Sequence, residues 1–126
     1  MSKVIAGITT SVDGFITGPD DGPEAGLGVD GHRLHAWLGD GDGVDPNTYR
    51  PDGPSAVVFD EMMETGAVLV GRRTFDIAGH WDGDHHDGVP IFILSRHEPP
   101  GEFANMPLVT YVDDVTTAMT NRKRVV

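Results

Sequence analysis

The stretch VLVGRRTFD, residues 68–76, decides the fold of this chain. Three β-forming residues run into Gly71, and two arginines and a threonine follow at once. This order predicts a strand that ends at Gly71 and a helix that begins with Arg72 and Arg73. The two adjacent arginines call for an explanation, because the chain has only 9 Lys and Arg against 20 Asp and Glu.

The rest of the carboxyl-terminal half repeats the same alternation. Apolar runs at 89–95 (VPIFILS) and 107–112 (PLVTYV) predict two more strands. A last helix is expected from residue 115, with Asp113 or Asp114 as its N-cap. Continuous apolar strands that alternate with helices are typical of a mainly parallel sheet covered on both faces. We therefore predict an α/β fold.

The amino-terminal half differs in its residue composition. Lys3–Thr10 (KVIAGITT) is rich in β-branched residues and predicts a buried first strand. Residues 14–54 are rich in glycine and proline, so we expect a long, poorly ordered loop with one short helix, Gly31–Leu38. A further helix should begin with Ser55 as N-cap and end at Gly66 as its C′ glycine. The residues expected to share its apolar face are Val58, Met62 and Met63.

Composition limits the function classes. The formal net charge of −11 argues against nucleic acid or an anionic membrane as the main partner, since both need basic surfaces. A small anionic ligand is compatible with this charge, because two or three placed arginines can hold one phosphate. The chain has no cysteine, which excludes disulfides, thiolate metal sites and cysteine nucleophiles. With no long apolar run and no signal-like start, a cytoplasmic location is expected.

The candidate site lies at the strand ends, because ligands of open parallel sheets bind beyond the carboxyl ends of the strands. We expect glycine to permit a sharp turn after the first of these strands, and the helix start and the guanidinium groups to attract an anion. A hydroxyl beside a second arginine follows the next strand, so the two clusters together suit a dinucleotide with a 2′-phosphate. The alternative is that the arginines pair with surface carboxylates. The residues concerned are Gly71, Arg72, Arg73, Thr74, Ser95 and Arg96.

Several motifs, in this order, resemble the dihydrofolate reductase superfamily, and most closely the bacterial proteins similar to the reductase domain of riboflavin biosynthesis. The motifs are TTSVDGFITGPD (9–20), AVLVGRRTFD (67–76), VPIFILSRHEPP (89–100) and LVTYVDDV (108–115). The resemblance implies one domain over residues 1–126, with a three-layer α/β/α fold. It also implies NADPH as cofactor and hydride transfer to a small pterin- or pyrimidinone-like substrate.

The resemblance assigns roles to single residues. The pyrophosphate and 2′-phosphate side of NADPH would contact Gly71, Arg72 and Thr74. The adenosine would lie between Leu94, Ser95 and Arg96. The nicotinamide would face the backbone around Ile8 and Thr9, and the mobile loop over it would begin at Asp13 and Gly14.

The sequence departs from the family in two ways. Family members continue past the last helix, so the chain would match only their amino-terminal two thirds, and Lys3–Thr10 would lack its neighbouring strands. The sheet would then need the missing portion or a second copy, so we expect a homo-oligomer such as a homodimer. The family's acid is also absent, because the helix Gly31–Leu38 offers only His32 and His35. Dihydrofolate reduction is therefore not inferred. Asp13 is the best remaining acid, although Asp-Gly is more often a turn.

Other features leave alternatives open. HWDGDHHDG, residues 80–88, could hold a transition metal, but its spacing fits no common metal motif, so we interpret it as a solvated acidic loop and predict no metal. Trp37 and Trp81 could be core or pocket residues. A second hypothesis for the whole chain is a nucleotide-binding or assembly module that has the fold without the chemistry.

Overall fold

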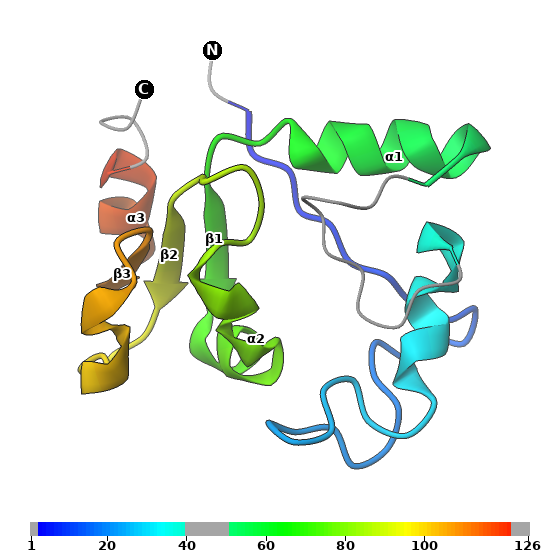
Figure 1. The fold of residues 1–126 in the computed structure, drawn as a ribbon, viewed down its shortest axis with the longest axis horizontal. Coiled ribbons are helices and arrows are strands. Elements are labelled where there is room, and N and C mark those ends of the chain that lie inside the picture. Colours follow the sequence, from blue (N-terminus) through cyan, green and yellow to red (C-terminus); the bar gives the residue numbers. More distant parts are fainter. Residues whose placement is uncertain (1–2, 40–50, 122–126) are drawn as a thin grey trace. The chain divides into compact units, whose positions relative to one another are not determined.

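The computed structural model describes residues 3–39 and 51–121, and the chain divides into two compact units, Met1–Glu64 (unit 1) and Thr65–Val126 (unit 2). The helices of unit 1 are the 3-10 helix η1 (Gly31–Leu38) and α1 (Gly53–Met63) (Figure 1). The elements of unit 2 are β1 (Val68–Gly71), α2 (Arg72–Ile77), η2 (Gly79–Gly83), β2 (Ile91–Leu94), η3 (Gly101–Asn105), β3 (Val109–Val112) and α3 (Val115–Asn121).

Unit 2 is a small α/β structure built on a three-stranded parallel sheet of order β1-β2-β3. Gly71, Leu94 and Val112 are register partners, so the strands end level with one another. Helices connect the parallel strands, as their geometry requires. The α/β class and the parallel sheet predicted from the alternating pattern are thus confirmed.

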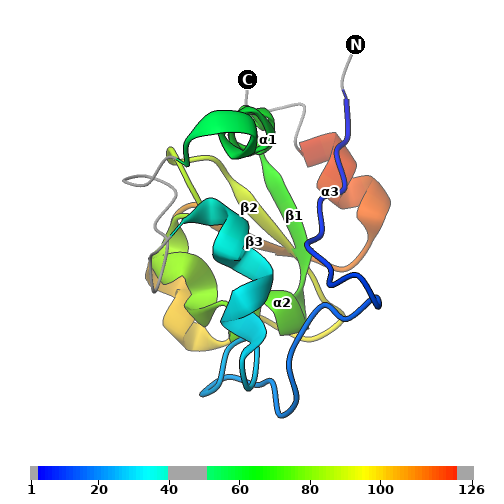
Figure 2. The ribbon, with the colours of Figure 1, turned by 90° about the vertical axis from the view of Figure 1, so that its right-hand side faces the viewer.

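Both faces of this sheet are covered, and β2 supplies the centre of both cores. Ile91 and Ile93 are buried on the face of α2 and η3, where they pack with Phe75 and Phe103. Phe92 packs in a second cluster with Ala118 of α3. Figure 2 shows α3 beside the strands of the sheet. Each such side chain stabilises the fold by about 1.5–3 kcal/mol when buried. The second cluster consists of Phe92, Val112 and Ala118.

The predicted start of the last helix, α3, is confirmed. The backbone N–H of Thr117 donates to Asp114 Oδ1 at 2.8 Å, and the Thr117 hydroxyl also donates to this carboxylate. Asp114 is therefore the cap of α3, one of the two residues expected there. These hydrogen bonds from Thr117 lower the pKa of Asp114.

The predicted ends of α1 are wrong. The helix begins at Gly53, so its N-cap is Asp52, three residues before the expected Ser55. Pro54 lies in the first turn, where proline needs no N–H partner and already has a helical φ. The helix ends at Met63, and Gly66 does not have a left-handed φ. The expected face is also shifted: Phe59 is the buried residue, whereas Val58 is 50% exposed.

The prediction of a buried strand at Lys3–Thr10 is wrong. The segment has neither strand nor helix and is exposed except at Thr9, although Figure 1 shows it as a drawn-out trace at the blue end of the chain. Its β-branched residues favour an extended backbone, but a strand also needs a partner. Within the described residues, no backbone hydrogen bond joins Val4–Thr10 to another segment.

The loop of unit 1 is folded on itself between Gly18 and Gly31. Gly18 N–H donates to Leu27 O at 2.7 Å, and Val29 N–H donates to Pro19 O at 2.8 Å. A side chain at Gly18 would place its Cβ only 1.9 Å from the Val29 carbonyl oxygen, so this close approach requires glycine. The short helix predicted over Gly31–Leu38 is present as η1. Residues 40–50 of the predicted loop lie outside the described residues.

Candidate functional site

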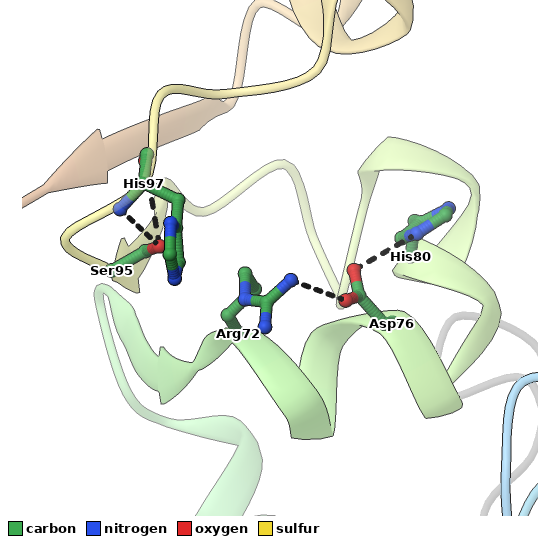
Figure 3. A network of polar contacts seen from close by, with 5 residues as sticks. All are labelled: Arg72, Asp76, His80, Ser95 and His97. Atoms are coloured by element: carbon green, nitrogen blue, oxygen red, sulfur yellow. Dashed lines mark hydrogen bonds and ion pairs between the residues drawn. The ribbon is translucent and has the colours of Figure 1, made fainter.

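The level strand ends of unit 2 bring together the two predicted polar clusters. The ladder continues one residue beyond the strands, since Ser95 N–H donates to Val112 O at 2.9 Å. The Ser95 hydroxyl accepts the His97 N–H at 3.1 Å and lies 3.4 Å from the His97 carbonyl oxygen (Figure 3). This turn fixes Ser95 and leaves Arg96 exposed at its tip. Within the described residues, Arg96 makes no ion pair.

Arg72 has a carboxylate partner. Its Nη1 lies 3.9 Å from Asp76 Oδ2, one turn along α2, and Asp76 Oδ1 lies 3.4 Å from His80 Nε2 (Figure 3). The alternative weighed for the arginines, pairing with a nearby carboxylate, therefore holds for Arg72. Such an exposed i,i+4 pair is worth only about 0.3–0.5 kcal/mol, so an incoming anion could replace Asp76 at little cost.

The change from β1 to α2 at Gly71 does not need the conformational freedom of glycine that is expected there from the sequence. The Gly71 φ of −77° and ψ of 156° are open to any residue, so that expectation is wrong. A Cβ built on Gly71 would meet no atom within 4 Å, which leaves open space beside the backbone where β1 becomes α2. The helix itself has only six residues, so charged side chains rather than its dipole must provide most of the attraction for an anion.

The other predicted cofactor residues of unit 2 divide into two kinds. Arg73 and Thr74 lie exposed on α2. Leu94 is half-buried and packs against the cluster of Phe92 under α3, so its side chain contributes to the core. The side chains of Arg73 and Thr74 thus lie at the surface, whereas Leu94 would offer a ligand mainly its backbone.

Sequence reasoning missed Tyr111 of β3. Its hydroxyl is buried and has no hydrogen-bond partner among the described residues. Burial and then the charge of Asp76 raise the pKa of this phenol, so it stays protonated and can donate a hydrogen bond. The apolar alternation of VTYV indicated a core position and gave no sign of the nearby carboxylate.

Unit 1 contains an open hollow of about 480 Å³. Its charged lining residues are Asp13, Asp30 and Arg33, and hydroxyls and apolar side chains surround them. This mixture can accept and donate hydrogen bonds around a small flat ligand. The remaining lining residues are Thr10, Ser11, Val12, Phe15, Thr17, Gly18, Gly31 and Leu34.

Asp13 forms part of a turn at the edge of this hollow. Its Oδ1 accepts the Ser11 hydroxyl at 2.6 Å, and the same hydroxyl oxygen accepts the Phe15 N–H at 2.9 Å. Gly14 follows with a φ of +90°, a left-handed value that favours glycine. This geometry agrees with the interpretation of Asp13 as a turn residue. Asp13 also lines the hollow, and its role as an acid stays a prediction.

The predicted nicotinamide contacts also lie in unit 1. Ile8 is exposed, and the Thr9 hydroxyl accepts the indole N–H of Trp37 at 3.4 Å. His32 is exposed on η1, whereas burial lowers the pKa of His35 and keeps its ring neutral near pH 7.

Asp30 and Arg33 are the lining residues that sequence reasoning missed. Asp30 directly precedes η1 and has a left-handed φ of 56°. Asp30 lies one residue outside the predicted helix Gly31–Leu38, which itself contains no acid. An Asp-Gly pair before a helix was the available signal, and it matches the Asp-Gly pair at residue 13.

The histidine-rich segment of residues 80–88 differs from the solvated loop predicted for it. His86 is only 1% exposed, and His85 packs edge-on against Trp81 at a centroid distance of 4.6 Å. The solvated interpretation is wrong for these rings because they extend the aromatic core around Phe75, although Asp82 is exposed. Among residues 3–39 and 51–121, no three His, Asp or Glu side chains are grouped to hold a metal ion.

Comparisons with protein-family models, with curated proteins and with solved structures found no match for this chain. None of the helices in the described part of the chain combines the length and the apolar character needed to cross a membrane.

Proposed function

We propose that this chain is an NADPH-dependent reductase of a small heterocyclic substrate, with a fold of the dihydrofolate reductase type. One observation carries the proposal: two adjacent parallel strands end level, and each is followed at once by arginine and hydroxyl side chains. Guanidinium groups at neighbouring strand ends can bind the phosphates of a dinucleotide.

The residues at this edge fit the phosphates of NADPH. Arg96 is exposed and has no ion-pair partner among the described residues, and Arg72 is held only by the long contact to Asp76. The open space beside Gly71 lets a phosphate approach the backbone. Arg96 is the better candidate for the 2′-phosphate, since it gives up no partner. When bound, NADPH would supply the hydride.

The hollow of unit 1 supports the choice of substrate class. Asp13 and Asp30 can accept hydrogen bonds from ring N–H and amino groups, and Arg33 can donate to a ring carbonyl. A pterin or pyrimidinone carries both kinds of group. Asp13 or a water molecule would supply the proton, because the described lining offers no buried acid.

The test is NADPH consumption, followed by absorbance, with a panel of pterins and pyrimidinones. Activity should appear with at least one of them. The variants Asp30→Asn and Arg33→Gln should raise KM for that substrate, whereas Glu24→Gln, an exposed charge outside the lining, should not. Cofactor binding without turnover on the whole panel would contradict the reductase.

A second candidate is a nucleotide-binding module without catalysis. The observation in its favour is that the Asp13 carboxylate already accepts the Ser11 hydroxyl and is exposed, so the best acid of the sequence is used in a turn. NADPH binding with no substrate turnover would support this candidate.

A further inference from the structure

His80 is placed against α2 by a left-handed turn. The helix ends at Ile77, and all residues of η2 have positive φ values. Three of them are not glycine: His80 at 60°, Trp81 at 47° and Asp82 at 50°. Such residues rarely adopt this region, and they stay in it only where the surrounding contacts require it. The turn folds the chain back, so His80 remains beside the helix that it follows (Figure 3).

The contacts of His80 explain this placement. Its Nε2 lies 3.4 Å from Oδ1 of Asp76, and its ring centroid lies 4.9 Å from that of Phe75 and 4.6 Å from that of Phe103. On its other oxygen Asp76 meets Nη1 of Arg72 at 3.9 Å. Arg72 is always charged, whereas His80 forms an ion pair only when its ring is protonated. The carboxylate is therefore shared between a fixed charge and a titrating one.

We propose that Asp76 and His80 are positioning residues for Arg72, and that binding of an anion by Arg72 is linked to the uptake of a proton by His80. The inference rests on the proposed function, in which Arg72 leaves Asp76 to hold a phosphate of NADPH. A carboxylate that loses one cation favours the charged form of the other, so Asp76 then favours the imidazolium form of His80. The bound anion acts in the same direction, since it neutralises Arg72. The proton comes from solvent, and no covalent bond changes.

The coupling acts in both directions, because linkage between two binding events is reciprocal. An anion that binds with uptake of a proton binds more tightly as the pH falls. Exposed pairs at i,i+4 spacing shift an equilibrium by about a factor of two, and both contacts of Asp76 have this spacing. The affinity for an anion should therefore rise about twofold from pH 8 to pH 6, the range in which imidazole titrates.

The other groups near His80 that titrate or carry charge do not take its place in this coupling. Glu102 of η3 and Asp82 of η2 are exposed, and no ion pair joins either of them to His80 within the described residues. Burial raises the pKa of the Tyr111 phenol on β3, so this group is neutral at both pH 6 and pH 8. Burial also lowers the pKa of His85 to about 4, so its ring is neutral in the same range.

The first test measures sulfate binding to the full chain by NMR titration at pH 6 and pH 8, at constant ionic strength. Sulfate resembles a phosphate group and keeps its charge over this range, so a change in affinity reports on the protein. The wild type should bind sulfate about twofold more tightly at pH 6. His80→Gln, which keeps a donor for Asp76, should bind equally at the two pH values. Asp76→Asn frees Arg72 and should bind more tightly than the wild type at pH 8, with no pH dependence.

His97→Gln is the matched control, because His97 lies exposed in the strand-end turn and its own protonation would attract an anion. This variant should keep the difference between pH 6 and pH 8. A difference that survives in His80→Gln and disappears in His97→Gln would overturn the proposal. Sulfate binding that is independent of pH in the wild type would contradict this inference alone. Absence of both sulfate and NADPH binding would contradict the proposed function as well.

A second measurement needs no ligand. NMR of the histidine ring protons gives the fraction of His80 that is protonated at pH 7. Arg72→Ala removes the competing cation and should raise this fraction, whereas Asp76→Asn should lower it. Arg73→Ala removes the same charge from the neighbouring position and should change the fraction less. Equal fractions in Arg72→Ala and in the wild type would refute the coupling.

Discussion

Gly18 is the residue where the loop of unit 1 leaves least room. A Cβ there would lie 1.9 Å from the Val29 carbonyl oxygen, which is backbone and cannot move aside cheaply. Gly18→Ala should therefore lower the free energy of unfolding by about 2 kcal/mol or more. Gly22→Ala, where a Cβ meets nothing within 4 Å, is the control and should change it by less than about 0.5 kcal/mol. Urea unfolding measures both. Equal effects would show that the loop is looser than this contact implies.

His85 gives the fold a pH dependence. Burial, and then the neighbouring His86, lower the pKa of His85 to about 4, against 6.5 in the unfolded chain. Its Nδ1 lies 2.6 Å from Nδ1 of His86, so protonation of both rings would place two positive charges in contact. The unfolded chain binds the proton first as pH falls, so this contribution is full above about pH 6.5 and is lost on the way to pH 4.

The expected size is about 1–2 kcal/mol, reduced from the full shift because the ring is partly exposed. The measurement is urea unfolding at pH 7 and pH 4.5 for the wild type and for His85→Gln. The wild type should lose more stability over this interval than His85→Gln does. Identical losses would mean that His85 is as accessible to protons in the folded state as in the unfolded one.

At the scale of elements, the cap of α3 can be tested by three substitutions. Asp114 accepts the Thr117 N–H and the Thr117 hydroxyl, so Asp114→Ala should lower the urea midpoint of unit 2. Asp114→Asn keeps an acceptor and should lose much less. Asp113→Ala removes the same charge beside it and serves as the control. The loss should vanish in acid, since the lowered pKa of Asp114 means that its contribution disappears only when that carboxyl is protonated. A loss of the same size for Asp113→Ala would refute the cap.

The elements that the sequence predicts well are those with a strong local pattern. The strand-to-helix junction at Gly71 and the apolar runs that follow it appear where expected, because continuous β-forming residues bounded by breakers leave few alternatives. The start of α1 was misplaced because a proline competes with serine for the first turn. The segment Lys3–Thr10 was overpredicted because composition favours an extended chain but cannot supply its partner.

At the scale of the site, the positions of the strand-end arginines could be predicted from the sequence, whereas contacts between segments far apart in the chain could not. The arginines do follow the strands, and the i,i+4 spacing of Arg72, Asp76 and His80 was a local signal for their contacts that sequence reasoning did not use. Asp30 and Arg33, at the start of η1, line the hollow of unit 1 together with residues of the preceding loop, and no sequence pattern predicts that this loop folds beside the helix. Such contacts depend on tertiary packing, which local residue preferences do not encode.

At the scale of the whole molecule, each of the two units contributes one feature to the proposed function. Unit 2 offers a basic strand-end edge, and unit 1 offers a hollow with carboxylates and an arginine. A reductase needs both kinds of site, one for the cofactor and one for the substrate. Substitutions at the strand ends of unit 2 should therefore weaken cofactor binding and leave substrate binding to unit 1 unchanged. Substitutions in the hollow of unit 1 should weaken substrate binding and leave the contacts of the cofactor phosphates with unit 2 unchanged.

The central claim is that the strand-end arginines hold a 2′-phosphate, and the most direct measurement is equilibrium binding of NADPH and NADH to the wild type and to Arg96→Ala. Each charge-assisted contact is worth about 1.5–3 kcal/mol, so the substitution should weaken NADPH binding tenfold or more and leave NADH binding unchanged. Arg72→Ala should act in the same direction with a smaller effect, because Arg72 must first leave Asp76. Lys3→Ala removes one charge from unit 1 and should change neither affinity. Equal losses for the two cofactors in Arg96→Ala, or no preference for NADPH in the wild type, would contradict the account.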